Sequence, residues 1–228
     1  MALYAIGDPH LSLGSSKPMD VFGGAWVGYV EKLKKGFQGI GEEDTVVLCG
    51  DISWGMSLAE SKEDFAFLEA LPGQKIILKG NHDYWWATAS KMEHFFQEQG
   101  ISSIRILHNN CHFYGEYALC GTRGWFFEED MKKQNQKVFN RELLRLETSL
   151  KAAGKREIIC FLHYPPCYQG YRCEPILELL EAYGVSRCYY GHLHGASHRL
   201  ALQGKQNGVE YRLISADYVN FRPEKICD

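Results

Sequence analysis

Seven side chains suited to binding divalent metals are spread along the chain in five short groups, each just after an apolar run. They are two carboxylates, four imidazoles and one carboxamide: Asp8, His10, Asp51, Asn81, His163, His192 and His194. Nitrogen and oxygen ligands without thiolate suit borderline divalent ions such as manganese, iron or zinc. Seven ligands are too many for one tetrahedral site but enough for two ions that share a carboxylate. The sequence therefore predicts a dinuclear metal hydrolase.

The spacing within two of these groups supports a shared cavity. Asp8 and His10 are two residues apart, and so are His192 and His194. In an extended backbone, side chains two residues apart lie on the same face, so each pair can address one cavity. A glycine adjoins most of the groups and permits a sharp turn there.

The elements that must position these ligands alternate between strand-like and helical patterns. Five apolar runs are typical of strands buried on both faces: 3–6, 45–49, 75–78, 157–162 and 187–190. Apolar residues at helical spacing lie between them, within 26–37, 65–71 and 139–150. Ligands of open α/β sheets collect beyond the carboxyl ends of the strands, so we expect one sheet edge to gather the seven side chains.

Other runs predict antiparallel additions. Residues 105–107, 111–114 and 117–120 follow one another without an intervening helical pattern and are expected to pair as a meander. Residues 199–202 and 209–214 flank a turn-rich stretch and predict a hairpin. The expected fold class is α/β, with two mixed sheets packed together and covered by helices, in a single domain over residues 1–228.

Composition narrows the classes of function. The chain of 228 residues is 45% hydrophobic and 23% charged, as in globular proteins with a full core. Neither a membrane span nor a secretory signal is visible, and the eight cysteines lack a CxxC pair. We therefore expect buried free thiols and a cytoplasmic protein. A net charge of −3 and the lack of a basic stripe argue against binding to nucleic acid.

The five groups together resemble the motifs of the calcineurin-like metallophosphoesterases. They occur in order between residues 8 and 194: Asp8-Pro9-His10, Gly50-Asp51, Gly80-Asn81-His82-Asp83, His163 and Gly191-His192-Leu193-His194. The shorter motifs alone are common turn or surface composition, whereas the string Gly80-Asn81-His82-Asp83 is specific and five motifs in order are seldom a coincidence. The resemblance implies a four-layer α/β/β/α sandwich and hydrolysis of a phosphodiester or small phosphomonoester by metal-activated hydroxide.

The resemblance also implies a role for each motif residue. One ion would be held by Asp8, His10 and His194, and the other by Asn81, His163 and His192. Asp51 would bridge both ions. His82 would be the catalytic histidine that binds no metal, and Asp83 would be the carboxylate that orients it.

Two subfamilies fit poorly. Ser/Thr protein phosphatases typically continue the second motif as aspartate-arginine-glycine and end the third in glutamate, whereas this chain has Ile52 after Asp51 and Asp83 at the end of the third motif. Purple acid phosphatases place a metal-binding tyrosine where this chain has Trp54, and indole N–H is a donor only. A protein phosphatase stays an alternative, and so does a non-catalytic scaffold of the same fold, although a scaffold would be expected to lose a ligand.

Residues outside the motifs suggest how a substrate is held. Arg123 is a candidate for binding a phosphate oxygen, with a surface salt bridge as the alternative. An aromatic group beside the motifs is interpreted either as core or as the wall of a pocket for a nucleotide-like group: Trp54, Tyr84, Trp85, Trp86, Trp125 and Phe126. His198 is a candidate for a role behind a ligand.

Overall fold

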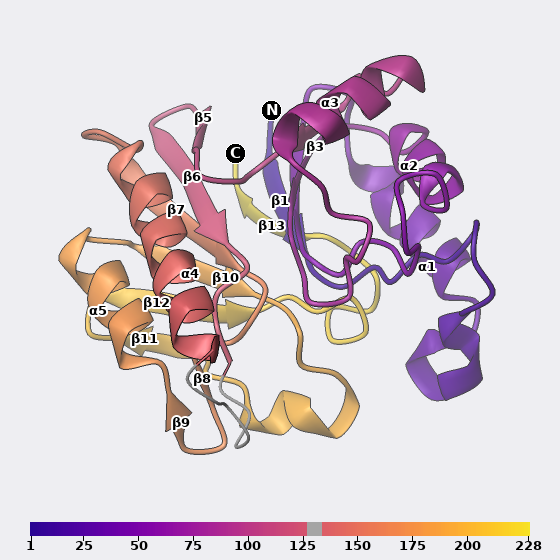
Figure 1. Cartoon of the computed structure of the whole chain (residues 1–228). Helices are drawn as coiled ribbons and strands as arrows, with labels where there is room; N and C mark the ends of the chain where they lie inside the picture. Colours follow the sequence, from indigo (N-terminus) through magenta and orange to yellow (C-terminus); the bar gives the residue numbers. More distant parts are fainter. Residues whose placement is uncertain (127–133) are drawn as a thin grey trace.

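The computed structural model describes residues 1–126 and 134–228, and most of its strands form two sheets (Figure 1). The first sheet has the order β13-β1-β2-β3-β4, with β13 at Glu224–Cys227, β1 at Leu3–Ile6, β2 at Thr45–Cys49, β3 at Gln74–Leu78 and β4 at Ile104–Ile106. Strands β1 to β4 are parallel, and β13 adds an antiparallel edge. The apolar runs predicted as central strands are thus strands here, because both of their faces are covered.

The second sheet has the order β11-β12-β10-β7-β6-β5. Its strands are β11 (Gly204–Gln206), β12 (Val209–Leu213), β10 (Arg187–Tyr190), β7 (Glu157–Leu162), β6 (Tyr117–Thr122) and β5 (His112–Tyr114). The four central strands are parallel and the two edge strands antiparallel. A separate two-stranded hairpin joins β8 (Cys167–Tyr168) to β9 (Tyr171–Arg172).

Helices cover the outer face of each sheet (Figure 1). The first sheet carries α1 (Tyr29–Gly36), α2 (Lys62–Glu69) and α3 (Ala89–Glu98), and the second carries α4 (Gln134–Lys151) and α5 (Glu174–Ala182). Apolar side chains at helical spacing, such as Phe65 and Leu68 of α2 or Leu146 and Leu150 of α4, are buried against the sheets. Short 3₁₀ helices lie at Met19–Phe22, Gly24–Trp26, Phe37–Gly39 and Gly195–Leu200.

A third apolar core lies between the two sheets. It joins Val47 and Ile76 of the first sheet to Leu119, Ile159 and Phe161 of the second, and all five are buried. The chain is therefore an α/β protein of four layers in the order α/β/β/α, as the resemblance implied. This packing brings the carboxyl ends of parallel strands from both sheets to the same region.

The expected meander is only partly correct. Strands β5 and β6 pair antiparallel, but β4 pairs parallel with β3 in the other sheet. The reason is α3, which precedes β4 and provides the crossover that parallel neighbours need. Met92 and Phe96 form the buried stripe of this helix, which was not among the helices predicted from the sequence.

The expected hairpin is displaced along the chain. Its first arm is β11, inside the stretch expected to turn, while residues 199–200 belong to a 3₁₀ helix and not to a strand. Asn207 and Gly208 both have positive φ values, +49° and +88°, and form the two-residue connection to β12. Such two-residue turns fix the register of a hairpin, so the arms lie directly beside them.

Two composition-based expectations can be compared with this fold. All eight cysteines are free, and six of them are buried, as predicted. Across the two described segments, none of the helices combines the length and apolar character required to cross a bilayer.

Candidate metal centre

The seven predicted ligands lie just beyond the carboxyl ends of parallel strands in both sheets. Asp8 follows β1, Asp51 follows β2, Asn81 follows β3, His163 follows β7 and His192 follows β10. His10 and His194 come two residues after Asp8 and His192. The gathering place is thus an edge shared by two sheets, where the sequence indicated the edge of one.

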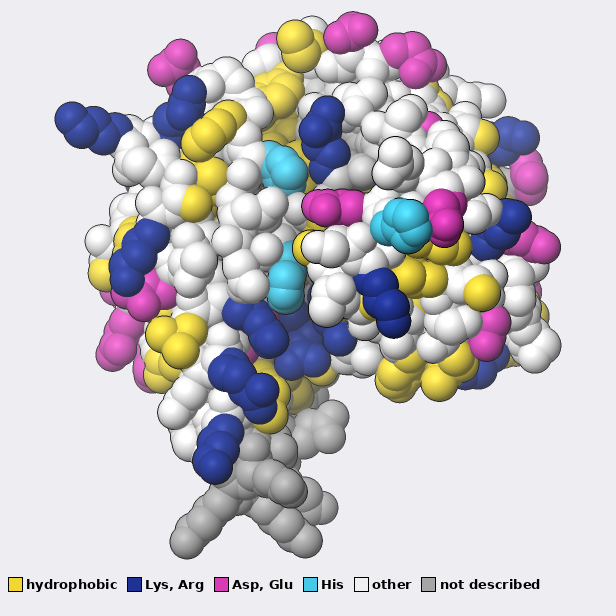
Figure 2. Space-filling model, turned by 45° about the horizontal axis from the view of Figure 1, so that its top comes forward, with side chains coloured by type: hydrophobic (Ala, Val, Ile, Leu, Met, Phe, Trp, Pro, Cys, Tyr) yellow, Lys and Arg dark blue, Asp and Glu magenta, His cyan; other side chains and the backbone are white. Residues whose placement is uncertain are grey.

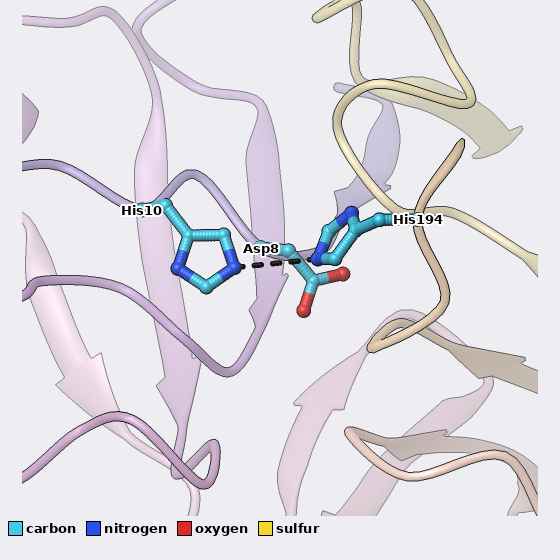
Figure 3. A group of neighbouring side chains, drawn as sticks. All are labelled: Asp8, His10 and His194. Atoms are coloured by element: carbon cyan, nitrogen blue, oxygen red, sulfur yellow. Dashed lines mark hydrogen bonds between the residues drawn. The ribbon is translucent and has the colours of Figure 1, made fainter. Parts of the chain in front are cut away.

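One group consists of Asp8, His10 and His194, whose potential ligand atoms all lie within 4.8 Å of one another. The side chains converge from different segments, as Figure 3 shows. The Nε2 atoms of His10 and His194 are 3.3 Å apart. Two ring nitrogens facing each other beside a carboxylate are suited to sharing a cation.

A second group consists of Asp51, His163 and His192, again with ligand atoms within 4.8 Å. The side-chain oxygen of Asn81 lies 2.6 Å from Nε2 of His163 and so adds a fourth donor atom. His163 is fully buried, and its Nδ1 faces the carbonyl of Cys49 at 3.0 Å. An Nδ1–H that donates to this carbonyl leaves Nε2 with its lone pair toward the group.

Asp51 belongs to the second group and also faces the first. Its Oδ2 atom is 3.7 Å from Nε2 of His10 and 3.5 Å from Nε2 of His163. Its Oδ1 atom accepts a hydrogen bond from the backbone N–H of His82 at 2.8 Å. Oδ2 is buried and accepts no hydrogen bond from the residues described. A buried carboxylate oxygen without a donor is costly, and a cation on each side would satisfy it.

The backbone is held in an unusual conformation at four of the predicted ligands. Asp8, His10, Asp51 and His192 have φ values of +56°, +46°, +49° and +72°. Residues with a Cβ rarely adopt this left-handed region, and each costs about 1–3 kcal/mol where the surroundings impose it. Strain of this kind concentrates at functional sites because it aims particular side chains.

Burial sets the protonation of the cluster. It raises the pKa of Asp8 to about 8 and that of Asp51 to about 6, while it lowers the pKa of His163 and of His192 to about 3. The imidazoles of His163 and His192 therefore stay neutral, with lone pairs available, and the two carboxylates lack a sufficient counter-charge from the protein. A divalent cation would supply that charge, so the donor set fits the metals implied by the resemblance.

Asp217 is a residue of the centre that the sequence analysis missed. Its Oδ1 atom lies 2.8 Å from Nδ1 of His194, and Oδ2 accepts from the backbone N–H of Gly195 at 3.0 Å. His198 lies on its other side, with Nε2 3.3 Å from Oδ2. Burial lowers the pKa of His194, but the hydrogen bond with Asp217 and the nearby Asp8 outweigh burial and raise it. The carboxylate thus fixes the imidazole from behind.

His82 lies at the edge of the cluster without joining either group. Its ring packs on the indole of Trp54, with the centroids 4.4 Å apart, and Trp54 also stacks on His10 at 5.2 Å. The Nδ1 atom of His82 is buried and has no hydrogen-bond partner among the described residues. The indole is thus the nearest ring that packs on the His82 imidazole, which also contacts His10 and Tyr84.

Asp83 occupies a different place from the one expected. Its carboxylate accepts from the backbone N–H groups of Ile52 at 2.8 Å and Gly80 at 2.7 Å, and from the indole N–H of Trp85 at 3.0 Å. These bonds tie together the loops after β2 and β3. Asp83 therefore positions the segments that carry the ligands, and it does not hold the His82 imidazole in this structure.

Comparison with known proteins bears on this geometry. The model of the family described as calcineurin-like phosphoesterase matches residues 1–196. The chain belongs to the calcineurin-like phosphoesterases. A comparison with curated proteins found no match.

Solved structures share the fold of this calcineurin-like phosphoesterase. A phosphopantetheinyl hydrolase from Mycobacterium tuberculosis aligns with a TM-score of 0.60 at 12% identity, over 99% of this chain and 95% of its own. A protein of unknown function from Aquifex aeolicus aligns with a TM-score of 0.51 at 16% identity, over 98% and 95% of the two chains. Identities this low show a common fold.

Some of the predicted aromatic residues lie in the core and others line one of two cavities. Arg123 lines one of these cavities. Trp85 is only 2% exposed and packs on Phe65 in the core, whereas Trp86 lines a cavity together with Arg123. A separate cavity opens on the candidate metal centre of the phosphoesterase, and its aromatic walls are Trp54 and Trp26, the latter missed by the sequence analysis. The remaining members differ in exposure, since Tyr84 is exposed, Phe126 half-buried and Trp125 buried.

Replacing Asp217 tests whether it supports a metal ligand. Because Asp217→Ala removes the acceptor behind His194, we expect the affinity for divalent metal to fall by about 10–100-fold, as is typical for such partners. Competition with a chromophoric chelator would measure the affinity. Asp228→Ala is the control, since the side chain of Asp228 is 89% exposed. Equal affinities for both variants would contradict the supporting role.

Proposed function

We propose that the chain hydrolyses phosphodiesters or small phosphomonoesters with two divalent ions, Mn, Fe or Zn. The observation that carries this proposal is Asp51, whose buried Oδ2 atom lacks a donor and lies between two groups of ligand-type side chains. One carboxylate oxygen placed between two such groups suits a bridge between two cations. A single ion would use only one of the two groups of ligand-type side chains.

In this proposal, Asp8, His10 and His194 hold one ion, and His163, His192 and Asn81 hold the other. Asp51 contacts both ions. When bound, the ions supply the Lewis acidity that activates water and offsets the negative charge on the phosphoryl oxygens.

In this proposal His82 donates a proton to the leaving oxygen. It lines the cavity at the centre, and its ring packs on Trp54 without belonging to either group of ligands. A protonated imidazole held there can transfer its proton as the bond from phosphorus to the leaving oxygen breaks. Asp83 contributes by fixing the loops on which Asp51 and His82 stand.

The organic part of the substrate would lie in the cavity beside His10 and His194. This cavity has a volume of about 510 Å³, in the range of small-molecule sites, and Met19, Trp26 and Trp54 form apolar walls. The apolar and aromatic walls suit a flat organic group such as a nucleobase. A nucleotide-like ester is therefore a suitable substrate.

The two alternatives have less support. A Ser/Thr protein phosphatase is disfavoured by Ile52 and Asp83, which replace the residues typical of that subfamily. A non-catalytic scaffold has no need to keep four ligand-type residues in strained backbone conformations.

Replacing the shared carboxylate tests the two-metal proposal. Asp51→Asn should abolish turnover and reduce the number of bound ions, since a neutral amide cannot offset two adjacent cations. Elemental analysis of metal-loaded protein would count the ions. A single ion in the wild-type protein under saturating manganese would rule the proposal out.

Replacing His82 should affect rate far more than metal content. Loss of a general acid typically costs about 10²–10⁴-fold in rate, and the cost should shrink for leaving groups such as p-nitrophenolate that need no proton. Steady-state kinetics with good and poor leaving groups, together with metal analysis, would test this. If His82→Ala instead empties a metal site while activity per ion is kept, His82 is a ligand.

Substrate class can be tested with three probes. We expect activity on bis(p-nitrophenyl) phosphate slightly above that on p-nitrophenyl phosphate, and both well above that on a phosphopeptide. Trp54→Ala should raise KM for the aromatic esters, whereas Trp86→Ala, in the other cavity, should not. A strong preference for the phosphopeptide would favour the protein phosphatase.

A further inference from the structure

A second cavity, of about 410 Å³, lies beside the candidate metal centre and is lined by basic residues. Lys79, Arg123 and Arg145 face it, and Glu142 is the one carboxylate among its described lining residues. Lys79 comes two residues before Asn81, and the carbonyl of Arg123 accepts from the backbone N–H of His163 at 3.2 Å. The residues that line the cavity are therefore neighbours in sequence or hydrogen-bond partners of the predicted ligands. They come from both sheets and from α4.

The positive charge of this cavity is not balanced by those of its lining residues that the structure describes. Both oxygens of Glu142 are already used, one by the Thr122 hydroxyl and the other by Arg145 at 3.0 Å. Neither Lys79 nor Arg123 forms an ion pair with any described residue, and both are half-buried. Lys and Arg side chains gather in the hollowed centre of the face in Figure 2, next to a histidine. Partly desolvated cations without counter-charges attract an anion.

Two hydrogen-bond donors of the lining also lack acceptors. Nε of Arg123 and Nε1 of Trp86 are buried and have no partner among the residues described. Native proteins satisfy nearly all buried donors, so donors that lack acceptors beside unpaired cations indicate a ligand that accepts hydrogen bonds. His108 adds a neutral polar group, because burial and the nearby Arg145 lower its pKa.

We propose that this cavity binds a phosphate-sized anion. Guanidinium groups recognise tetrahedral oxyanions through charge-assisted hydrogen bonds, and Lys79 adds a point charge. The source of the anion rests on the function proposed above: it is a second phosphate group of the substrate, whose ester phosphate lies at the metal centre. The chain thus selects substrates with two phosphate groups.

Direct binding tests the first half of the proposal. Calorimetric titration of metal-loaded protein with inorganic phosphate should show a phosphate site that Arg145→Gln weakens roughly tenfold or more, the effect of losing a charge-assisted contact. Arg141→Gln is the matched control, because Arg141 is an exposed residue one turn earlier on α4 and does not line the cavity. Lys79→Gln is a second variant, with its metal content measured. Phosphate binding that neither Arg145→Gln nor Lys79→Gln changes would overturn the proposal.

Kinetics test the source of the anion. In Arg145→Gln, the KM for adenosine 3′,5′-bisphosphate should rise roughly tenfold relative to the wild type. The KM for adenosine 5′-monophosphate and the kcat for both substrates should stay unchanged. If Arg145→Gln weakens phosphate binding but leaves the KM for the bisphosphate unchanged, the anion is not part of the substrate, and the cavity binds free phosphate. If the metal-loaded protein turns over no phosphoester, the proposed function fails, while the titration still decides whether the cavity binds phosphate.

Discussion

The candidate centre depends on how closely the strand ends of the two sheets approach each other. A Cβ atom on Gly191, after β10, would lie 2.4 Å from Oδ2 of Asp8, after β1, and one on Gly50, after β2, would lie 2.7 Å from Nδ1 of His163, after β7. No side chain larger than hydrogen fits at these two positions unless a ligand side chain or the neighbouring backbone moves. The apolar core between the sheets holds this separation, so packing far from the centre sets the distances within it.

This close approach has an electrostatic cost. Asp8 and Asp51 are almost completely buried, and burial raises the pKa of both carboxyl groups. A folded state that holds protons more tightly than the unfolded chain loses stability as pH rises, so without a cation the cluster opposes folding at neutral pH. A divalent ion that binds only the folded chain reverses the balance. Metal binding and stability of the fold are thus linked through the same two carboxylates.

Residues near a motif were predictable from sequence, whereas residues joined only by the fold were not. Asp8 and His10, or His192 and His194, are recognisable as pairs in the sequence, but they lie in the loops after β1 and β10, where positive φ values at Asp8, His10 and His192 replace the extended backbone that their spacing suggested. Asp217 lies 23 residues from the His194 that it supports, in a segment without a motif, and only the return of the chain after β12 brings them together. The predicted pairing of β4 was wrong for a related reason. The partner of a strand depends on the crossover helix that precedes it and not on the strand's own residues.

The difference between the two cavities could likewise not be predicted from the sequence, because it depends on residues that only the fold brings together. Trp54 and Trp86 each come a few residues after a motif aspartate and look equivalent in sequence, yet they line cavities of opposite character. The cavity with Trp54 is mainly apolar, whereas the one with Trp86 contains Lys79 and Arg123. A substrate whose organic group also carries a second phosphate can place the flat part of that group in the apolar cavity and the second phosphate in the basic one. The orientation of such a substrate follows from desolvation and charge, before any contact with the metals is considered.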